Sequence, residues 1–166
     1  MGELTPPVLA ARAAARFSKL LELALSDVSL SLPQYRLLLF LSRAPEQRAT
    51  VLADSLDVSP PSLTALVDGC VARGLVERVT SPEDRRRVLH LVTAAGHDLL
   101  AQADTAVADL LSEVVSHVPA AKAKRIVEGL ELLAEAIDQG AAARRAAHEA
   151  ATATAAATAA DSKAGA

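Results

Sequence analysis

The fold is decided by residues 59–93, which read SPPSLTALVDGCVARGLVERVTSPEDRRRVLHLVT. Ser59 is a typical helix cap with Pro60 behind it, and apolar residues then recur at helical spacing until Gly74, a typical helix stop. Two short runs rich in leucine and valine follow, at 75–79 and 88–92, and predict two strands. The eight residues between them, 80–87, include three consecutive arginines and exceed the usual length of a hairpin loop.

The residues before this stretch predict three further helices. The first covers about 7–28, and the second runs from Ser31, which forms a capping box with Gln34, to about Ser42. Thr50 is expected to cap a short third helix that ends at Leu56, ahead of a tight turn at 57–59. Two short helices joined by such a turn, followed by two strands, have the order of a winged helix-turn-helix.

The residues after the strands predict two long helices. Thr93 is expected to cap the first, and Pro119 marks the start of the second, whose apolar stripe continues to Ile137. From Gly140 onward 15 of 27 residues are alanine. This Ala-rich tail, 140–166, has the composition to prolong the last helix but lacks large apolar residues to dock it.

Composition agrees with a mostly α protein that has a small two-stranded β-wing. The chain has 166 residues, 37 of them alanine, and only two Phe, one Tyr and no Trp. It has no apolar run long enough for a membrane span and no pattern of a secretory signal, so we expect a cytoplasmic protein without a membrane partner. A single cysteine excludes an internal disulfide and a multi-cysteine metal cluster.

No motif for catalysis, a metal or a cofactor is present in the sequence. The four histidines are scattered without metal-ligand spacing, and neither a glycine-rich phosphate loop nor a nucleophile elbow occurs. The net charge of −3 hides an uneven distribution, because residues 33–93 carry eight arginines against seven acids while residues 94–139 carry three basic groups against eight acids. The relatively basic middle therefore remains compatible with DNA, whose phosphates respond to the local patch.

Residues 30–100 resemble the MarR family of winged helix-turn-helix transcription regulators. The stretches that carry the resemblance are Leu32-Pro33-Gln34-Tyr35, Val58-Ser59, Leu66-Val67-Asp68, Ala72-Arg73-Gly74-Leu75-Val76-Glu77-Arg78, Ser81-Pro82-Glu83-Asp84-Arg85-Arg86-Arg87 and Leu91-Val92-Thr93 with Gly96. The resemblance implies a winged helix-turn-helix at 29–93 and helical dimerisation regions at 1–28 and 94–139. It also implies a homodimer that binds double-stranded DNA at a pseudo-palindromic operator, as a repressor released by a small effector.

The resemblance assigns DNA contact to two segments. In the wing it implies that Asp84 braces Arg86, which enters the minor groove, with Arg85 and Arg87 beside it; a plain solvated turn is the alternative. On the second helix of the motif, Ser59, Pro61, Ser62 and Thr64 occupy positions that face bases and phosphates. Ala65 and Gly69 stand where family members often carry a basic residue, so an ordinary capped helix is the alternative there.

An effector site is implied between the dimerisation helices and the winged region. Its ligand is expected to be a small aromatic or phenolic acid, with Arg16 facing the anion and Phe17 and Tyr35 flanking the ring. The alternative interpretation is that Arg16 is a solvated surface charge and that Phe17 and Tyr35 fill the core. Cys70, in the apolar stripe, is either a buried core residue or a redox sensor, and burial is the favoured reading.

The leading hypothesis is thus a ligand-responsive, DNA-binding regulator. The alternative is a helical dimerisation or interaction protein on the same fold that does not bind DNA, motivated by the acidic helices at 94–139 and by the uncharged recognition helix. An enzyme is a third class, and no constellation of residues supports it.

Overall fold

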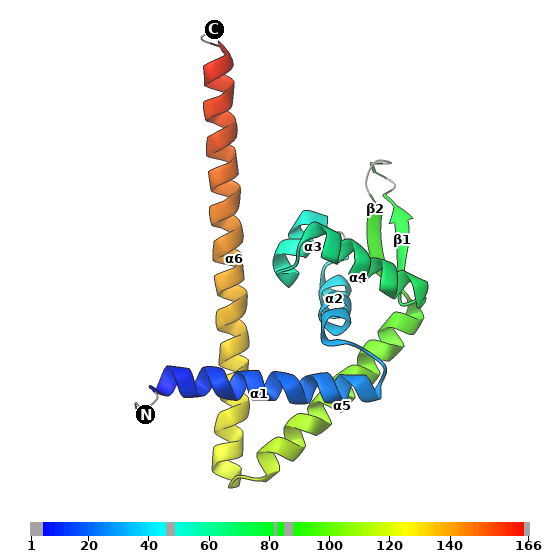
Figure 1. The fold of residues 1–166 in the computed structure, drawn as a ribbon, viewed down its shortest axis with the longest axis vertical. Helices are drawn as coiled ribbons and strands as arrows, with labels where there is room; N and C mark the ends of the chain where they lie inside the picture. Colours follow the sequence, from blue (N-terminus) through cyan, green and yellow to red (C-terminus); the bar gives the residue numbers. More distant parts are fainter. Residues whose placement is uncertain (1–4, 46–48, 82, 85–87, 165–166) are drawn as a thin grey trace. The chain divides into compact units, whose positions relative to one another are not determined.

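The computed structural model describes residues 5–45, 49–81, 83–84 and 88–164, which form six helices and one hairpin in two compact units (Figure 1). The first unit, residues 1–114, contains α1 (Pro6–Asp27), α2 (Leu32–Arg43), α3 (Ala49–Leu56), α4 (Pro60–Ala72), β1 (Val76–Thr80), β2 (Val88–Val92) and most of α5 (Ala94–Ser116). The second unit, residues 115–166, contains α6 (Ala120–Ala164). Within the described residues, every helix is too short or too polar to span a bilayer.

The capping residues explain where most of the helices begin. The Ser31 hydroxyl accepts from the Gln34 N–H while the Gln34 side chain accepts from the Ser31 N–H, so the predicted capping box is confirmed. Ser59 caps α4 as predicted. The expectation that Thr50 caps α3 is wrong, because the helix already includes Ala49 and Thr50 lies in its first turn.

The wing is a two-stranded antiparallel sheet with strand ends close to those predicted. Val76 pairs with Val92 and Thr80 with Val88, so β1 lies one residue later than the predicted 75–79 and the connecting loop shortens to 81–87. One further hydrogen bond in the same register, from the N–H of Thr93 to the Leu75 carbonyl at 3.1 Å, continues the pairing just beyond the ends of the two strands. This contact fixes the base of the wing against the start of α5.

Two glycines shape that base. Gly74 has φ +69°, a left-handed conformation that favours glycine, and it ends α4 and turns the chain into β1. The Thr93 hydroxyl donates to the Gly74 carbonyl at 2.7 Å and accepts from the Gly96 N–H at 3.0 Å. A Cβ on Gly96 would lie 2.2 Å from the Leu75 carbonyl oxygen, so only glycine lets α5 approach so closely.

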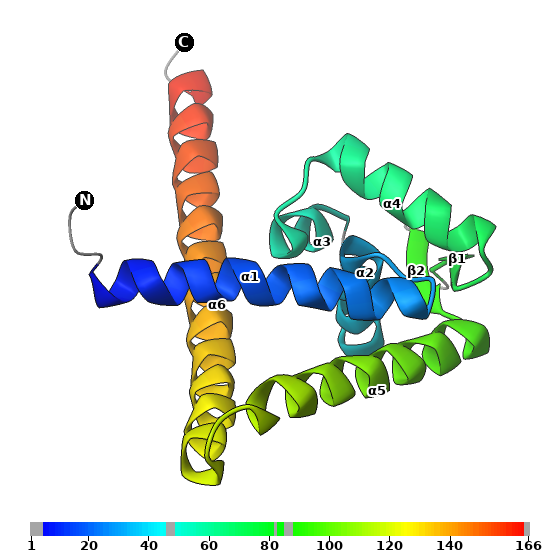
Figure 2. The ribbon, with the colours of Figure 1, turned by 60° about the horizontal axis from the view of Figure 1, so that its bottom comes forward.

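The core of the first unit gathers leucines from α1, α2, α3 and α4 with residues from the wing and α5. Its most deeply buried members are Leu25, Leu37, Leu38, Leu52, Val67, Val76 and Cys70. Figure 2 shows α2, α3 and α4 grouped beside the β1–β2 wing. Because α1 and α5 contribute Leu25, Leu100 and Ala103 to the same core, the winged region and its flanking helices form one compact unit.

The second unit consists mainly of α6, a 45-residue helix that includes the Ala-rich tail as far as Ala164. The tail therefore continues the helix, as its composition allows. Large apolar residues on α6 stay exposed, at 41% for Ile126, 49% for Leu133 and 57% for Ile137. Spacings of seven and four residues place these side chains on one face of the helix.

Candidate nucleic-acid interface

The helix α4 is anchored by one face and exposed along the other. Leu63, Val67 and Cys70 are buried in the core, at the three- and four-residue spacing of a helix side. Pro60, Pro61, Ser62 and Thr64 are exposed near the N-terminus of the helix. The core thus orients α4 so that the residues predicted to face DNA point to solvent.

The hydroxyls at this N-terminus also make local contacts. The Ser59 Oγ accepts from the Ser62 N–H at 3.3 Å and lies 2.8 Å from the Ser62 Oγ. The Thr64 hydroxyl donates to the Pro60 carbonyl at 3.0 Å. Since each hydroxyl has one donor and two acceptor positions, these contacts leave hydrogen-bonding capacity for a phosphate or a base.

The wing presents the second candidate surface. Glu83 and Asp84 are exposed in the loop between β1 and β2, whereas Ser81 at its start is buried. Arg85, Arg86 and Arg87 lie outside the described residues. The predicted bracing of Arg86 by Asp84 therefore stays a prediction.

An ion pair joins α4 to the wing, and the sequence analysis missed it. The Arg78 guanidinium on β1 donates to the Asp68 carboxylate on α4, with both side chains partly exposed. The sequence does show an acidic residue before the Gly74 turn and a basic residue after it, but only the tertiary structure shows that Asp68 and Arg78 meet. On β2, His90 pairs directly with Arg78, and burial followed by the nearby Arg78 charge lowers the pKa of His90.

Cys70 lies in the core, as the favoured interpretation of its sequence position predicts. Its side chain is 0% exposed, and burial raises the pKa of its thiol, against a smaller lowering effect of Arg73. A buried thiol with a raised pKa forms little of the reactive thiolate at neutral pH. These properties support a packing role over redox sensing.

The predicted effector residues occupy three different environments. Arg16 is exposed on α1, Phe17 is half-buried, and Tyr35 packs against the core. The Tyr35 hydroxyl donates to the Asp104 carboxylate on α5 at 2.7 Å. Burial and this carboxylate raise the pKa of Tyr35.

Arg16, Phe17 and Tyr35 do not line either of two cavities formed by described residues of the first unit. One, of about 590 Å³, lies between the end of α1 and the start of α2; its lining residues are Glu22, Ser26, Ser29, Leu30, Ser31, Leu32, Pro33 and Gln34. The other, of about 380 Å³, lies between α1 and α5 and includes Leu20, Leu23, Asp27, Asp109, Leu110 and Glu113. Tyr35 is the next residue in the sequence after Gln34, which lines the first cavity.

A helix-turn-helix whose second helix is followed by a two-stranded wing defines the class of winged helix-turn-helix proteins. Residues 28–87, which cover α2 to the wing loop, match the model of the MarR family. The winged helix-turn-helix of this chain is therefore similar to that of the MarR family, as the motifs in its sequence suggested.

Three relatives illustrate the similarity. An uncharacterized HTH-type transcriptional regulator from Bacillus subtilis, YhbI, is 34% identical over 85 residues, 51% of this chain and 55% of that protein. The match thus spans about half the length of this curated relative. A mutant of MarR from E. coli has a TM-score of 0.71 and 25% identity, with 80% of this chain and 98% of that chain covered. The MarR family protein Rv2887 from Mycobacterium tuberculosis, in complex with salicylic acid, has a TM-score of 0.66 and 25% identity, with 79% and 97% covered.

Proposed function

We propose that this protein is a DNA-binding transcriptional regulator that acts as a homodimeric repressor in the cytoplasm and is released by a small effector. The observation that carries the proposal is the arrangement of α4 and the wing. The helix is anchored by Leu63, Val67 and Cys70 and leaves its N-terminal face open. Such a helix fits the major groove with its first turn toward the bases, while the wing reaches an adjacent phosphate or the minor groove.

Dimerisation is supported by apolar surface that the chain itself leaves uncovered. The exposed face of α6 with Ile126, Leu133 and Ile137 is one part, and the groove between α1 and α5, beside the exposed Leu20 and Leu23, is another. A monomer rarely leaves such surface in water. A second copy of the chain is the proposed cover, and its wing would read the other half of a pseudo-palindromic operator.

The proposed effector is a small aromatic or phenolic acid. The similarity to a protein whose structure contains salicylic acid supports this class. The cavity between α1 and α2 supports it too, since its volume of about 590 Å³ falls in the range of small-molecule sites and its lining mixes leucines with serines and an amide.

A gel-shift experiment tests the proposal. The full chain is titrated onto the DNA upstream of its own coding sequence at two salt concentrations, with a scrambled duplex as control. We expect a specific shift that weakens at the higher salt, because the release of counterions from DNA favours binding less when the salt concentration is high. No shift even at low salt would favour the alternative, a dimeric interaction protein that does not bind DNA.

A further inference from the structure

The outward face of α4 carries only small side chains near its N-terminus. Pro61, Thr64 and Ala65 are exposed and lie three and four residues apart, so they share one side of the helix. The buried Leu63 and Val67 lie on the opposite side. A major groove that receives this end of α4 would therefore meet a proline ring, the methyl groups of Thr64 and Ala65, and one hydroxyl.

The backbone of the same turn has few hydrogen-bond donors to offer. Pro60 and Pro61 have no N–H, and the N–H of Ser62 donates to the Ser59 Oγ at 3.3 Å. The next N–H, that of Leu63, donates to the Ser59 carbonyl at 2.9 Å. Helix N-termini bind anions through free N–H groups. In the first turn of α4 these groups are either missing or already bonded.

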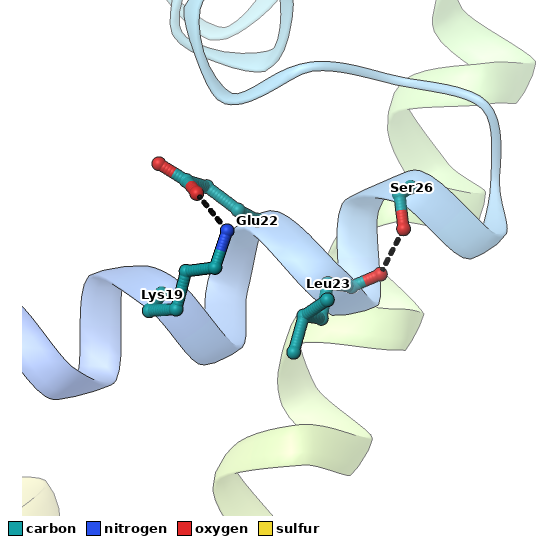
Figure 3. Close-up of polar contacts among 4 residues, drawn as sticks. All are labelled: Lys19, Glu22, Leu23 and Ser26. Atoms are coloured by element: carbon teal, nitrogen blue, oxygen red, sulfur yellow. Dashed lines mark hydrogen bonds and ion pairs between the residues drawn. The ribbon is translucent and has the colours of Figure 1, made fainter.

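The hydroxyl of Thr64 is turned toward its own helix. It donates to the Pro60 carbonyl at 3.0 Å, four residues earlier. A similar contact occupies the Ser26 hydroxyl on α1, which donates to the Leu23 carbonyl at 2.7 Å (Figure 3). Because the proton of Thr64 is used in this way, the γ-methyl group is the part of this exposed side chain that is offered to a ligand.

The helix also lacks the side chains that read purines directly. Guanine edges are recognised by Arg or Lys and adenine edges by Asn or Gln, and α4 contains none of these four residue types. Its one carboxylate, that of Asp68, is paired with Arg78 on β1. Arg73, beyond the far end of α4, donates to Gln34 on α2. What remains is apolar contact, for which the C5-methyl group of thymine is the partner in the major groove.

We propose that α4 reads its DNA site through thymine methyl groups, which contact Pro61, Thr64 and Ala65 in the major groove. Each half of the operator then places thymines opposite this face of the helix. Sequence preference comes from apolar contact in place of hydrogen bonds to purine edges. The inference rests on the proposed function and deepens it, because it names the base and the chemical group that the recognition helix selects.

The test compares two forms of the DNA upstream of the coding sequence, one made with thymine and one with uracil. Uracil pairs as thymine does but lacks the methyl group. The affinity of the full chain for each form is measured by fluorescence anisotropy at one salt concentration. We expect the uracil form to bind about tenfold more weakly, because a buried methyl group contributes about fourfold and each protomer would contact at least one.

Two variants of Thr64 separate its methyl group from its hydroxyl. Thr64→Ser keeps the hydroxyl that donates to the Pro60 carbonyl and removes only the methyl group. It should bind the thymine form about threefold more weakly and the uracil form as the wild type does, so its preference for thymine shrinks. Thr64→Val keeps a methyl group without the hydroxyl, and it should still prefer the thymine form by about tenfold.

Thr105→Ser is the matched control on α5. The Thr105 hydroxyl donates to the Ala101 carbonyl at 3.0 Å, also four residues earlier, and the side chain is exposed. The same methyl group is removed there, outside the proposed interface. Its preference for the thymine form should therefore equal that of the wild type.

The outcomes separate this inference from the proposed function. Equal affinity of the wild type for both forms would overturn the inference and leave DNA binding standing. An effect of uracil as large in Thr64→Ser as in the wild type would come from DNA shape and would also overturn it, as would a preference lost in Thr64→Val but kept in Thr64→Ser. No binding of either form would reject the proposed function itself.

Discussion

Asp68 on α4 and Arg78 on β1 form an ion pair across the Gly74 turn, so side chains as well as backbone tie the recognition helix to the first wing strand. Both partners are partly exposed, at 54% and 40% of the side chain. Such a pair adds little to the free energy of unfolding. We infer that its main effect is on the angle between the two DNA-facing elements.

Neutralising Asp68 separates the effect of the ion pair on the free energy of unfolding from its effect on the angle between α4 and β1. Asp68→Asn should change the free energy of unfolding by less than ~1 kcal/mol, as expected for an exposed pair, and should weaken DNA binding by about 1 kcal/mol. Loss of a negative charge alone would strengthen binding to phosphates, so the sign of the change is diagnostic. Glu77→Gln is the control when DNA affinity is measured by fluorescence anisotropy. It also removes one negative charge, but from the residue next to Arg78 on β1, whose side chain points to the other face of the sheet. Tighter binding by Asp68→Asn would show that Asp68 acts by repulsion only.

The wing prediction concerns Arg86 and Asp84. Arg86→Ala should sharply reduce DNA affinity and reduce its salt dependence, while the free energy of unfolding changes by less than ~0.5 kcal/mol, because we expect the side chain to face solvent in the free protein. Asp84→Ala should also weaken binding if the carboxylate directs the arginine. Unchanged affinity of Arg86→Ala would remove this residue from the interface, and stronger binding of Asp84→Ala would reject the bracing role.

Tyr35 is the single tyrosine of the chain, so its ionisation is read directly from ultraviolet absorbance. We expect a pKa above the usual value of about 10, because burial and the adjacent Asp104 carboxylate both disfavour the phenolate. Asp104→Asn should lower the pKa of Tyr35 toward that value. An ordinary pKa in the wild type would contradict the contact between α2 and α5.

The same shift has a consequence for stability. The folded state holds the Tyr35 proton more tightly than the unfolded chain, so the stabilisation is fully present below pH ~10 and declines as the pH rises beyond it. Chemical unfolding at a series of alkaline pH values, compared with Tyr35→Phe, measures this decline. The two proteins should lose stability in parallel if Tyr35 is not the group responsible.

The dimer prediction concerns the exposed face of α6. Leu133→Glu combined with Ile137→Glu should convert the dimer to a monomer, because two carboxylates would be buried in the contact. Gln139→Glu adds a charge at an exposed position on the same helix and is the control. Sedimentation at micromolar concentration should give twice 17.2 kDa for the wild type and for the control. A monomeric wild type would refute the homodimer.

Cys70 allows a test of its packing role. Because its side chain is 0% exposed, a thiol reagent should react with the native protein only as fast as the structure opens. Cys70→Ser should lower the free energy of unfolding by ~1–3 kcal/mol, since a hydroxyl is costlier to bury than a thiol. Rapid reaction in the folded state, accompanied by loss of DNA binding under peroxide, would restore the redox-sensing reading.

The sequence by itself determined the helices, the wing and the family resemblance, because these depend on local signals. Helix starts follow from side chains that cap the nearest backbone groups, as those of Ser31 and Ser59 do, and the end of α4 follows from the left-handed backbone that Gly74 allows. Strands follow from the change of hydrophobic period after residue 74. The start of α3 was the exception. A helical N-terminus has several candidate caps in sequence, and only the backbone conformation selects among them.

Only the tertiary structure decided which distant side chains meet. Tyr35 with Asp104, Arg73 with Gln34 and Asp68 with Arg78 are 69, 39 and 10 residues apart. Sequence periodicity assigns a residue to a face of its own helix but carries no information on what a neighbouring element places against that face. For this reason the sequence placed Tyr35 on a helix without indicating its carboxylate partner on α5, and it did not indicate the contact of Arg73, the C-cap residue of α4, with Gln34 on α2.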